Sequence, residues 1–172
     1  MAQLHQLRPL LTSDLTDLFE VQLACYGAHF VEDAQVFERR LASPANCSLA
    51  LELDGRVLAY LAAYRTSLGK VTPLHGDFAT GDAPNTLYLH DLAVHPRLKG
   101  QGAAGALLRS ACDQALRQGL IHSSLVSVQD SATFWRAMGY VARTLDDPLQ
   151  QALLEGYGAG AVYMEKRLSV AP

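Results

Sequence analysis

The sequence predicts an α+β domain built on a mixed, mostly antiparallel central sheet flanked by helices. Asp54-Gly55 separates two apolar runs, and this dipeptide accepts the positive φ angles of a tight hairpin turn. Later in the chain, an apolar strand, a glycine-rich loop, an amphipathic helix and a further strand follow one another. Because hairpins come first and only one β-α-β unit follows, the sheet is expected to be mixed rather than purely parallel.

Length and composition favour one domain spanning residues 1–172, with a hydrophobic core that needs neither disulfides nor a structural metal. Hydrophobic residues make up 49% of the chain and charged residues 18%, which is typical of a folded globular protein. The 14 basic residues are scattered and outnumbered by 17 acidic ones, so nucleic-acid binding through phosphate neutralisation is not expected.

The cysteines and the apolar runs further restrict the class of protein that the sequence predicts. Cys25, Cys47 and Cys112 are odd in number and far apart, which indicates neither a disulfide framework nor a zinc site. No apolar run approaches the ~18 residues that a membrane span requires, and residues 1–9 hold no apolar stretch of signal-peptide length. We therefore expect a cytoplasmic protein without a metal and without membrane contact.

Apolar spacing and turn signals place the elements of the first half. Thr12-Ser13-Asp14 offers capping side chains for a helix whose apolar face begins at Leu15. A second helix is expected to end before Pro44, because the residue preceding a proline avoids helical angles. The expected elements are a strand at residues 4–8, the capped helix, a helix at 33–41, antiparallel strands at 47–53 and 56–65, and an irregular segment at 66–85.

The second half is dominated by one strand and one helix. Thr86–Val94 reads as a central strand that Pro96 ends, since proline cannot donate to a ladder. A helix with a continuous apolar face follows, and Gly119 supplies its C-terminal stop. That face comprises Ala104, Leu107, Leu108, Ala111, Cys112 and Ala115. The remaining expected elements are a strand at residues 123–128, a short helix at 131–138, a strand start at 139–143 and a final strand at 161–168.

The loop before this helix reads Gly100-Gln101-Gly102-Ala103-Ala104-Gly105, which matches the Gly-x-Gly-x-x-Gly pattern of dinucleotide-binding folds. Residues 95–99 separate the strand from the first glycine, and too few residues follow Asp130 for a doubly wound sheet, so a nicotinamide cofactor is rejected. A phosphate loop is rejected because no Gly-Lys-Ser or Gly-Lys-Thr follows. What remains is a glycine-rich helix N-terminus, whose N–H groups and dipole favour a pyrophosphate.

Two sequence blocks carry a family resemblance. The first is Leu89-His90-Asp91-Leu92-Ala93-Val94-His95-Pro96, with Lys99-Gly100-Gln101-Gly102-Ala103-Ala104 and Leu107-Leu108 after it. The second is Phe134-Trp135 followed by Gly139-Tyr140. They resemble the acetyl-coenzyme A (acetyl-CoA) motif and the Phe-Tyr-x-x-x-Gly-Phe block of the GNAT superfamily of N-acetyltransferases. This resemblance implies the GNAT fold, acyltransferase activity and acetyl-CoA as the co-substrate.

The resemblance also implies where acetyl-CoA would lie. The backbone of Leu92 and Val94 would hold the pantetheine arm, while N–H groups of residues 99–104 would hold the pyrophosphate. The full set assigned to the co-substrate is Leu92, Ala93, Val94, Lys99, Gly100, Gln101, Gly102, Ala103, Ala104, Gly105, Ser131, Phe134 and Trp135.

Two residues depart from the family pattern. Lys99 stands where Gln or Arg usually begins the loop, and it offers a charge to a phosphate without the fork of arginine. Trp135 stands where many members carry a tyrosine that protonates the departing thiolate, and an indole is no acid at neutral pH. Ser131 or a water could donate that proton instead. Because a free thiol ionises near ~8.5, the loss of the tyrosine need not abolish turnover.

The reaction also needs a base for the incoming amine. Alternation along the strand places Tyr88 and His90 on the same face as Leu92 and Val94, with Asp91 opposite. An imidazole changes charge near neutrality, so His90 is the leading candidate to take a proton from the ammonium, directly or through water. Some superfamily members that acetylate arylalkylamines carry histidines at the positions of Tyr88 and His90, and this adds Tyr88 to the candidate positions.

Structural roles remain the alternatives for these residues. His90 could be a hydrogen-bonded structural histidine, and Asp91 either a water-mediated base or a buried acceptor that fixes a bulge in the strand. Four tyrosines at apolar-patterned positions are assigned to the core by default, with an acceptor-pocket wall as the minority alternative. They are Tyr26, Tyr60, Tyr64 and Tyr163.

The acceptor itself is left open by the sequence. We expect a primary amine of a small molecule that attacks acetyl-CoA directly in a ternary complex, with residues 27–32 and 66–85 as the loops that would select it. The alternatives are a non-catalytic module that binds coenzyme A for regulation, and acetylation of a protein N-terminus or lysine. The apolar residues 161–164 of the final strand could pair across a homodimer.

Overall fold

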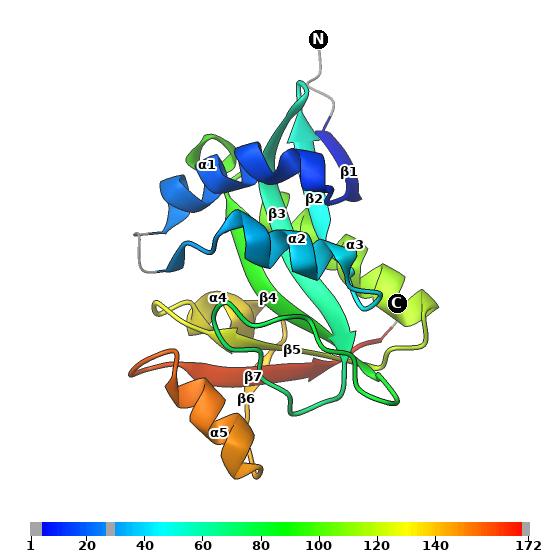
Figure 1. The fold of residues 1–172 in the computed structure, drawn as a ribbon, viewed down its shortest axis with the longest axis vertical. Helices are drawn as coiled ribbons and strands as arrows, with labels where there is room; N and C mark the ends of the chain where they lie inside the picture. Colours follow the sequence, from blue (N-terminus) through cyan, green and yellow to red (C-terminus); the bar gives the residue numbers. More distant parts are fainter. Residues whose placement is uncertain (1–4, 27–29, 170–172) are drawn as a thin grey trace.

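The computed structural model describes residues 5–26 and 30–169, and within them one sheet runs the length of the molecule (Figure 1). Its strands are β1 (His5–Pro9), β2 (Leu49–Leu53), β3 (Arg56–Thr66), β4 (Thr86–Val94), β5 (His122–Ser127), β6 (Val141–Ala142) and β7 (Val162–Arg167). The seven strands that are described lie in the order β1-β2-β3-β4-β5-β7-β6. Only β4 and β5 pair in parallel, so the predicted mixed, mostly antiparallel sheet is confirmed.

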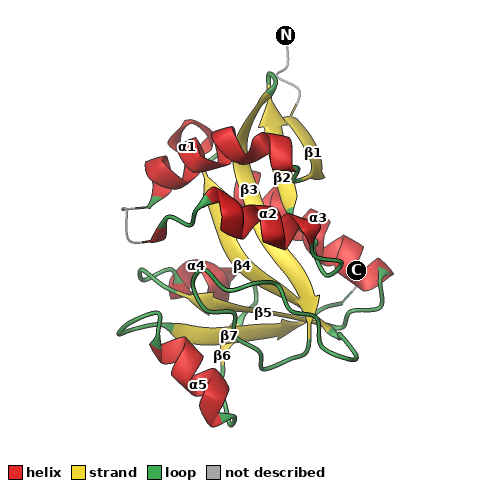
Figure 2. Ribbon diagram, in the orientation of Figure 1, coloured by secondary structure: helices red, strands yellow, loops and turns green. Residues whose placement is uncertain are grey.

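Helices cover both faces of this sheet (Figure 2). They are α1 (Leu15–Cys25), α2 (Ala34–Ala42), α3 (Ala103–Arg117), α4 (Ala132–Ala137) and α5 (Pro148–Glu155). α1 and α2 lie on one face, and α3 and α4 lie on the other, which separates the core into two clusters. The α3 cluster is centred on Leu61, Leu107 and Leu125, and the α1 cluster on Leu18, Phe37 and Tyr60.

The hairpin between β2 and β3 forms as its turn residues predict. Asp54 and Gly55 have φ angles of 52° and 78°, so both central residues of the turn adopt the left-handed conformation that a primed turn requires. The turn fixes the register, in which Leu53 lies opposite Arg56. The long strand β3 also pairs with β4, so it lies between β2 and β4 in the centre of the sheet.

A β-bulge interrupts β4 at His90. Ala62 lies opposite Asp91 while Ala63 lies opposite Leu89, so His90 is an extra residue without a partner on β3. The period-2 expectation for this strand is therefore wrong, because the extra residue reverses the alternation. Tyr88 packs in the α1 cluster, whereas Leu92 and Val94 pack against the α3 cluster on the opposite face.

β4 and β5 separate beyond the bulge. They pair over Thr86–Leu89 and His122–Leu125, and past these residues neither strand has the other as its neighbour. The backbone of β4 from Asp91 to Val94 therefore pairs with β3 alone. This divergence opens the sheet at its centre, between the N-terminus of α3 and the C-terminal end of α1 (Figure 1).

Two details differ from the sequence-based expectations. The Asp14 carboxylate does not cap α1; it accepts the Leu11 N–H at 2.8 Å and pairs with Arg8, while residues 12–14 form a 3₁₀ turn. The helix α5 was not predicted, although Asp147 caps it through the Leu149 N–H at 2.9 Å and a proline opens it. Leu4 of the expected first strand lies outside the described residues.

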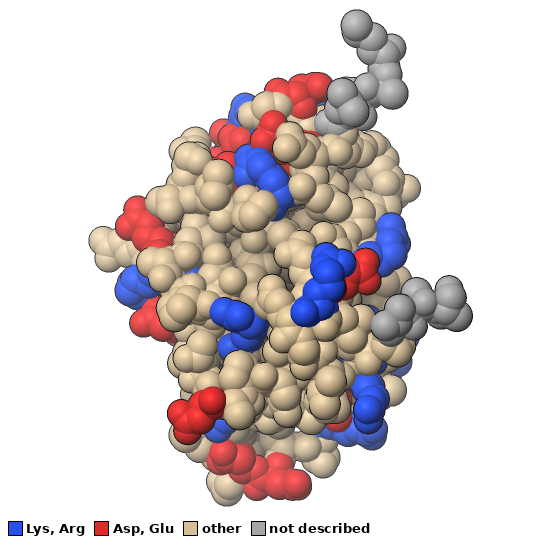
Figure 3. Space-filling view, turned by 90° about the vertical axis from the view of Figure 1, so that its right-hand side faces the viewer, with Lys and Arg blue, Asp and Glu red and all other residues tan. Residues whose placement is uncertain are grey.

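The surface carries both charge signs in mixture. Figure 3 shows Lys and Arg side chains interspersed with Asp and Glu over one face of the molecule. In the part of the chain that the structure describes, no helix has the length and apolar content needed to cross a bilayer.

Removal of one core side chain should measure how tightly α3 is docked. Leu107 is fully buried between α3 and the sheet, so Leu107→Ala should lower the free energy of unfolding by about 2–5 kcal/mol in urea denaturation. Leu149 on α5 is 64% exposed, and Leu149→Ala should change stability by less than about 0.5 kcal/mol. Equal losses in the two variants would contradict this account of the core.

Candidate functional site

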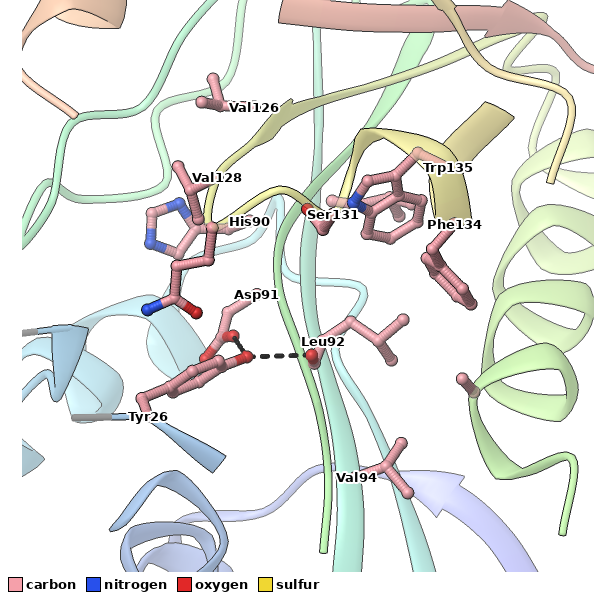
Figure 4. A pocket seen from close by; sticks show the side chains of 13 residues that line it. Tyr26, His90, Asp91, Leu92, Val94, Val126, Val128, Ser131, Phe134 and Trp135 are labelled. Carbon is pink, nitrogen blue, oxygen red and sulfur yellow. Dashed lines mark hydrogen bonds between the residues drawn. The ribbon is translucent and has the colours of Figure 1, made fainter. Parts of the chain in front are cut away.

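A cavity of about 300 Å³ occupies the opening between β4 and β5 (Figure 4). Figure 4 shows Tyr26 reaching toward Asp91 and Leu92, with His90 and Val128 on one side and Ser131 and Trp135 on the other. Its lining residues are Tyr26, Leu89, His90, Asp91, Leu92, Val94, Ala104, Val126, Val128, Gln129, Ser131, Phe134 and Trp135. The divergence of two strands thus brings four separate chain segments to one cavity.

A second cavity of about 660 Å³ lies over the glycine-rich loop. It shares Val94, Ala104 and Phe134 with the first cavity, so the two are neighbouring parts of one groove. Its other lining residues are Ala24, Cys25, Pro96, Leu98, Lys99, Gly100, Gly102, Ala103, Gly105 and Met138. The groove runs from the N-terminus of α3 to the centre of the sheet.

The glycine-rich loop has the form of an anion cradle. Gly100 and Gly102 have φ angles of 76° and 77°, and a Cβ placed on either residue would meet no other atom within 4 Å. The space over the backbone is therefore open, as a ligand that approaches main-chain N–H groups requires. Gly102 is the N-cap of the 15-residue α3, whose dipole favours negative charge at this end.

The edge of β4 supplies backbone donors to the same groove. The His95 N–H donates to the Leu58 carbonyl at 2.8 Å, so in an antiparallel pair the N–H groups of Leu92 and Val94 point away from β3. Their carbonyls are already engaged: Leu92 O accepts from the Tyr26 hydroxyl at 2.9 Å, and Val94 O from the Cys25 thiol at 3.1 Å. The edge therefore offers donors, which suit the amide carbonyls of an extended ligand.

A smaller cavity of about 60 Å³ adjoins the central cavity at His90 and Asp91. It shares six residues with the central cavity, among them His90, Asp91 and Tyr26. Phe30, Glu32, Leu74 and Tyr157 complete its wall together with Val126, Val128 and Gln129. The bulge in β4 therefore lines both the groove and a second, more acidic pocket.

Asp91 is held by two tyrosine hydroxyls. Tyr26 shares its one hydroxyl proton between Oδ1, at 2.6 Å, and the Leu92 carbonyl, and Tyr60 donates to Oδ2. Burial raises the pKa of Asp91, and it outweighs the opposing effect of the two hydrogen bonds. Burial and the neighbouring Asp91 charge also raise the pKa of Tyr26 and Tyr60, so both hydroxyls remain donors.

His90 and Glu32 form a buried pair beside Asp91. The His90 Nε2 lies 3.1 Å from Glu32 Oε2, and the two side chains are 2% and 3% exposed. Glu32 also receives hydrogen bonds from the fully buried Arg40 and, at 2.7 Å, from the His75 N–H. Burial alone would raise the pKa of Glu32, but the hydrogen bonds and charges of His90 and Arg40 lower it overall, so Glu32 is ionised.

The other two predicted catalytic residues, Tyr88 and Ser131, lie apart from each other. Tyr88 is fully buried, accepts the Thr72 N–H at 3.3 Å and does not line either cavity beside the bulge. Ser131 lines the central cavity, with its hydroxyl 3.0 Å from that of Ser127. Trp135 packs edge-on against Phe134 and Tyr140, at centroid distances of 5.0 and 5.5 Å.

Most residues assigned to the co-substrate line the groove, but two do not. Ala93 is buried in the α1 cluster, because the bulge turns it to that face. Gln101 is exposed and donates from Nε2 to the Arg97 carbonyl at 2.9 Å, without lining either groove cavity. Lys99, Phe134 and Trp135 are among the lining residues.

Sequence reasoning gives several lining residues no role or another role. Tyr26 is assigned to the core by default, with an acceptor-pocket wall as the alternative, and it lines both cavities; Tyr157 is not singled out, and Glu32 is included only as the end of an acceptor loop. Residues 27–32 were identified as an acceptor loop, of which 27–29 lie outside the described residues. Across residues 5–26 and 30–169, no three His, Cys, Asp or Glu side chains are grouped as metal ligands.

The Asp91 carboxylate should impose a pH-dependent cost on folding. Because its folded-state pKa lies above its ordinary value of 3.8, its contribution to stability is present below pH 3.8 and is lost as the pH rises through the folded pKa. Asp91→Asn lacks this loss, so its stability relative to the unmodified protein should increase between pH 4 and pH 7 in urea denaturation. Asp82→Asn, at an exposed carboxylate, should show no such trend. A relative stability of Asp91→Asn that falls with pH would contradict the assignment.

Several solved structures share the fold of this chain. The ribosomal-protein-S18-alanine N-acetyltransferase from Escherichia coli superposes with a TM-score of 0.68 at 17% identity, covering 98% of this chain and 97% of that chain. The loading GNATL domain of CurA from Lyngbya majuscula gives 0.75 at 14% identity, covering 96% and 98%. A GNAT family acetyltransferase from Brucella melitensis in complex with acetyl-CoA gives 0.63 at 17% identity, covering 99% and 92%.

These likenesses concern the fold, while the family rests on the sequence itself. No curated protein matches the chain. A family model described as the acetyltransferase (GNAT) family matches residues 13–140, which include β4, the glycine-rich loop, α3 and α4. The chain therefore belongs to the GNAT acetyltransferase family.

Proposed function

We propose that this protein transfers the acetyl group of acetyl-CoA to a primary amine of a small molecule, by direct attack in a ternary complex. The observation that carries the proposal is the continuity of the site. The groove that begins at the glycine cradle ends at the buried side chains of His90 and Asp91. An acyl carrier in the groove and an amine in the acidic pocket would meet across the bulge in β4.

The groove suits the chemistry of coenzyme A. The open backbone at Gly100 and Gly102 and the N-terminus of α3 would receive the pyrophosphate, with Lys99 close by as a cation. The N–H groups of Leu92 and Val94 would receive the carbonyls of the pantetheine arm. The bound thioester supplies an activated acyl group, and backbone donors near it can polarise its carbonyl.

The acidic pocket supplies the proton acceptor. An alkylammonium must lose a proton before its nitrogen can attack, and His90 lines both cavities at the point where amine and thioester would meet. Asp91 lies beside it with both oxygens engaged by tyrosines, so we assign it an electrostatic role toward the ammonium. Ser131, or a water next to it, is the candidate donor to the departing thiolate.

A non-catalytic coenzyme A-binding module is the alternative, and Trp135 favours it because the usual acid is absent. An acceptor panel of primary amines, protein N-termini and lysine peptides, assayed by thiol release from acetyl-CoA, separates these functions. Release well above the uncatalysed rate with a small amine supports the proposal. Binding of acetyl-CoA without thiol release across the panel would indicate the non-catalytic module instead. Thiol release with peptides alone would indicate that the acceptor is a protein and not a small molecule.

Gly102→Ala tests the cradle. A Cβ there would enter the space over the N-terminus of α3, so the Kd for acetyl-CoA should rise by at least about tenfold, measured by calorimetry. The left-handed backbone should also cost alanine about 1 kcal/mol of stability. Gly119→Ala is the matched control, since Gly119 has φ 81° beyond the other end of α3 and should lose similar stability with an unchanged Kd. A normal Kd in Gly102→Ala would place the pyrophosphate elsewhere.

His90→Ala tests the base. At pH 6 the acceptor amine is almost entirely protonated and needs a base, whereas at pH 9 a larger share is already neutral. The loss of kcat/KM should therefore be greater at pH 6 than at pH 9, with about a hundredfold loss at the lower pH. A loss of the same size at both pH values would remove His90 from the proton-transfer step.

A further inference from the structure

We propose that Glu32 is a positioning residue that fixes the tautomer of His90, so that Nδ1 of His90 is the atom that takes the proton from the acceptor amine. The proposal rests on the proposed function and assigns an atom and a second residue to its proton-transfer step. Glu32 lies in the segment before α2, far in sequence from β4, and no family motif marks it.

The contact between Glu32 and His90 decides which ring nitrogen carries hydrogen. An ionised carboxylate can only accept hydrogen bonds, and Glu32 Oε2 lies 3.1 Å from His90 Nε2. Nε2 must therefore be the donor. Since a neutral imidazole has one N–H and one lone pair, Nδ1 of neutral His90 carries the lone pair.

Nδ1 is placed to receive a proton. Among the described residues, none makes a hydrogen bond with this buried nitrogen. The His90 ring lines both the central cavity and the acidic pocket, while Nδ1 itself is buried, so the donor to Nδ1 must be a group bound against the ring rather than bulk solvent. A buried acceptor without a partner costs free energy, and a donor on the substrate would remove that cost.

Glu32 is held too firmly to leave this position. Oε1 accepts from Arg40 Nη2 at 2.8 Å and from the His75 N–H at 2.7 Å, while Oε2 accepts from Arg40 Nη1 and faces His90. Arg40 is itself fixed by the Gly76 carbonyl at 2.9 Å and by the rings of Phe37 and Phe78. Such a supporting shell keeps the imidazole in one orientation, as second partners of functional histidines do elsewhere.

The proton-transfer step balances with groups already placed. The ammonium gives one proton to Nδ1, and the freed lone pair on nitrogen attacks the thioester carbonyl carbon. The carbon–sulfur bond breaks, and the sulfur keeps its electron pair. The second proton of the nitrogen goes to the thiolate through Ser131 or water, and the imidazolium returns its proton to solvent. Glu32 stabilises the imidazolium throughout without itself changing protonation.

Several other titratable or charged groups face the same ring. They are Arg40 from α2, Tyr26 from the end of α1, Tyr88 and Asp91 from β4, and Tyr157 after α5. The burial-raised pKa values of the three tyrosines keep them neutral over the pH range of an assay. The charged neighbours of His90 are therefore Glu32, Arg40 and, when it is ionised, Asp91.

Nitrogen NMR of the unmodified protein tests the tautomer directly. Uniformly ¹⁵N-histidine-labelled protein is titrated, and the His90 ring signals are identified by their absence in His90→Gln. We expect neutral His90 to show a protonated Nε2 and an unprotonated Nδ1. A protonated Nδ1 in the neutral ring would overturn the proposal. This measurement needs no variant of Glu32. Such a variant would leave Arg40 buried without a charged partner and could therefore destabilise the fold.

Kinetics of Glu32→Gln test the role in turnover. We expect kcat/KM for the amine to fall by about tenfold or more at pH 6, with the loss shrinking toward pH 9 and an unchanged KM for acetyl-CoA. Glu38→Gln, the same change at an exposed position of α2, is the matched control and should leave the rate unchanged. A loss that is equal at all pH values indicates a merely structural role and overturns the proposal. Absence of transfer to every amine by the unmodified protein would instead overturn the proposed function, and the NMR result would still decide the tautomer.

Discussion

The β-bulge at His90 is the constraint on which the site depends. One extra residue in β4 brings the Asp91 side chain to the α1 face, where His90 also lies, and moves Leu92 and Val94 to the face of α3. It also lies where β4 leaves β5, so the same feature lines both the groove over the glycine-rich loop and the acidic pocket. In a regular strand, the side chains of Asp91, Leu92 and Val94 would each point to the opposite face. The groove and the acidic pocket would then lose these lining residues.

The ionisable side chains of the acidic pocket can be buried because each one has hydrogen-bond partners. Glu32 and Arg40 form a bidentate pair, which avoids the several kcal/mol that an isolated buried ion would cost. Among the described residues, Asp91 has no Lys or Arg partner and relies on two tyrosine hydroxyls, so burial disfavours its ionised form. When Asp91 is ionised, Arg40 faces two carboxylates, and the resulting negative balance suits a positively charged acceptor.

The elements with local signals could be predicted from sequence. Asp54-Gly55 specified a hairpin, and the glycines before α3 specified a helix N-terminus open to an anion. The bulge could not be read from the apolar alternation, because its cause is the pairing with β3 and the contacts of His90 and Asp91 with distant residues. For the same reason Tyr26 was placed in the core, although its hydroxyl bridges Asp91 and the Leu92 carbonyl.

The proposed reaction contains two proton transfers of unequal free energy. Deprotonating an alkylammonium of pKa about 10.4 at pH 7 costs about 4.6 kcal/mol, whereas releasing a thiolate whose acid has pKa about 8.5 costs about 2 kcal/mol. In the proposed reaction the larger cost arises at the amine, and the pocket proposed for the amine is lined by His90, Glu32 and Asp91. On the α4 side of the central cavity, where the thiolate would leave, lie the Ser131 hydroxyl and the indole of Trp135. A tryptophan is therefore compatible with acetyl transfer at this position, provided that the amine is activated on the other side of the bulge.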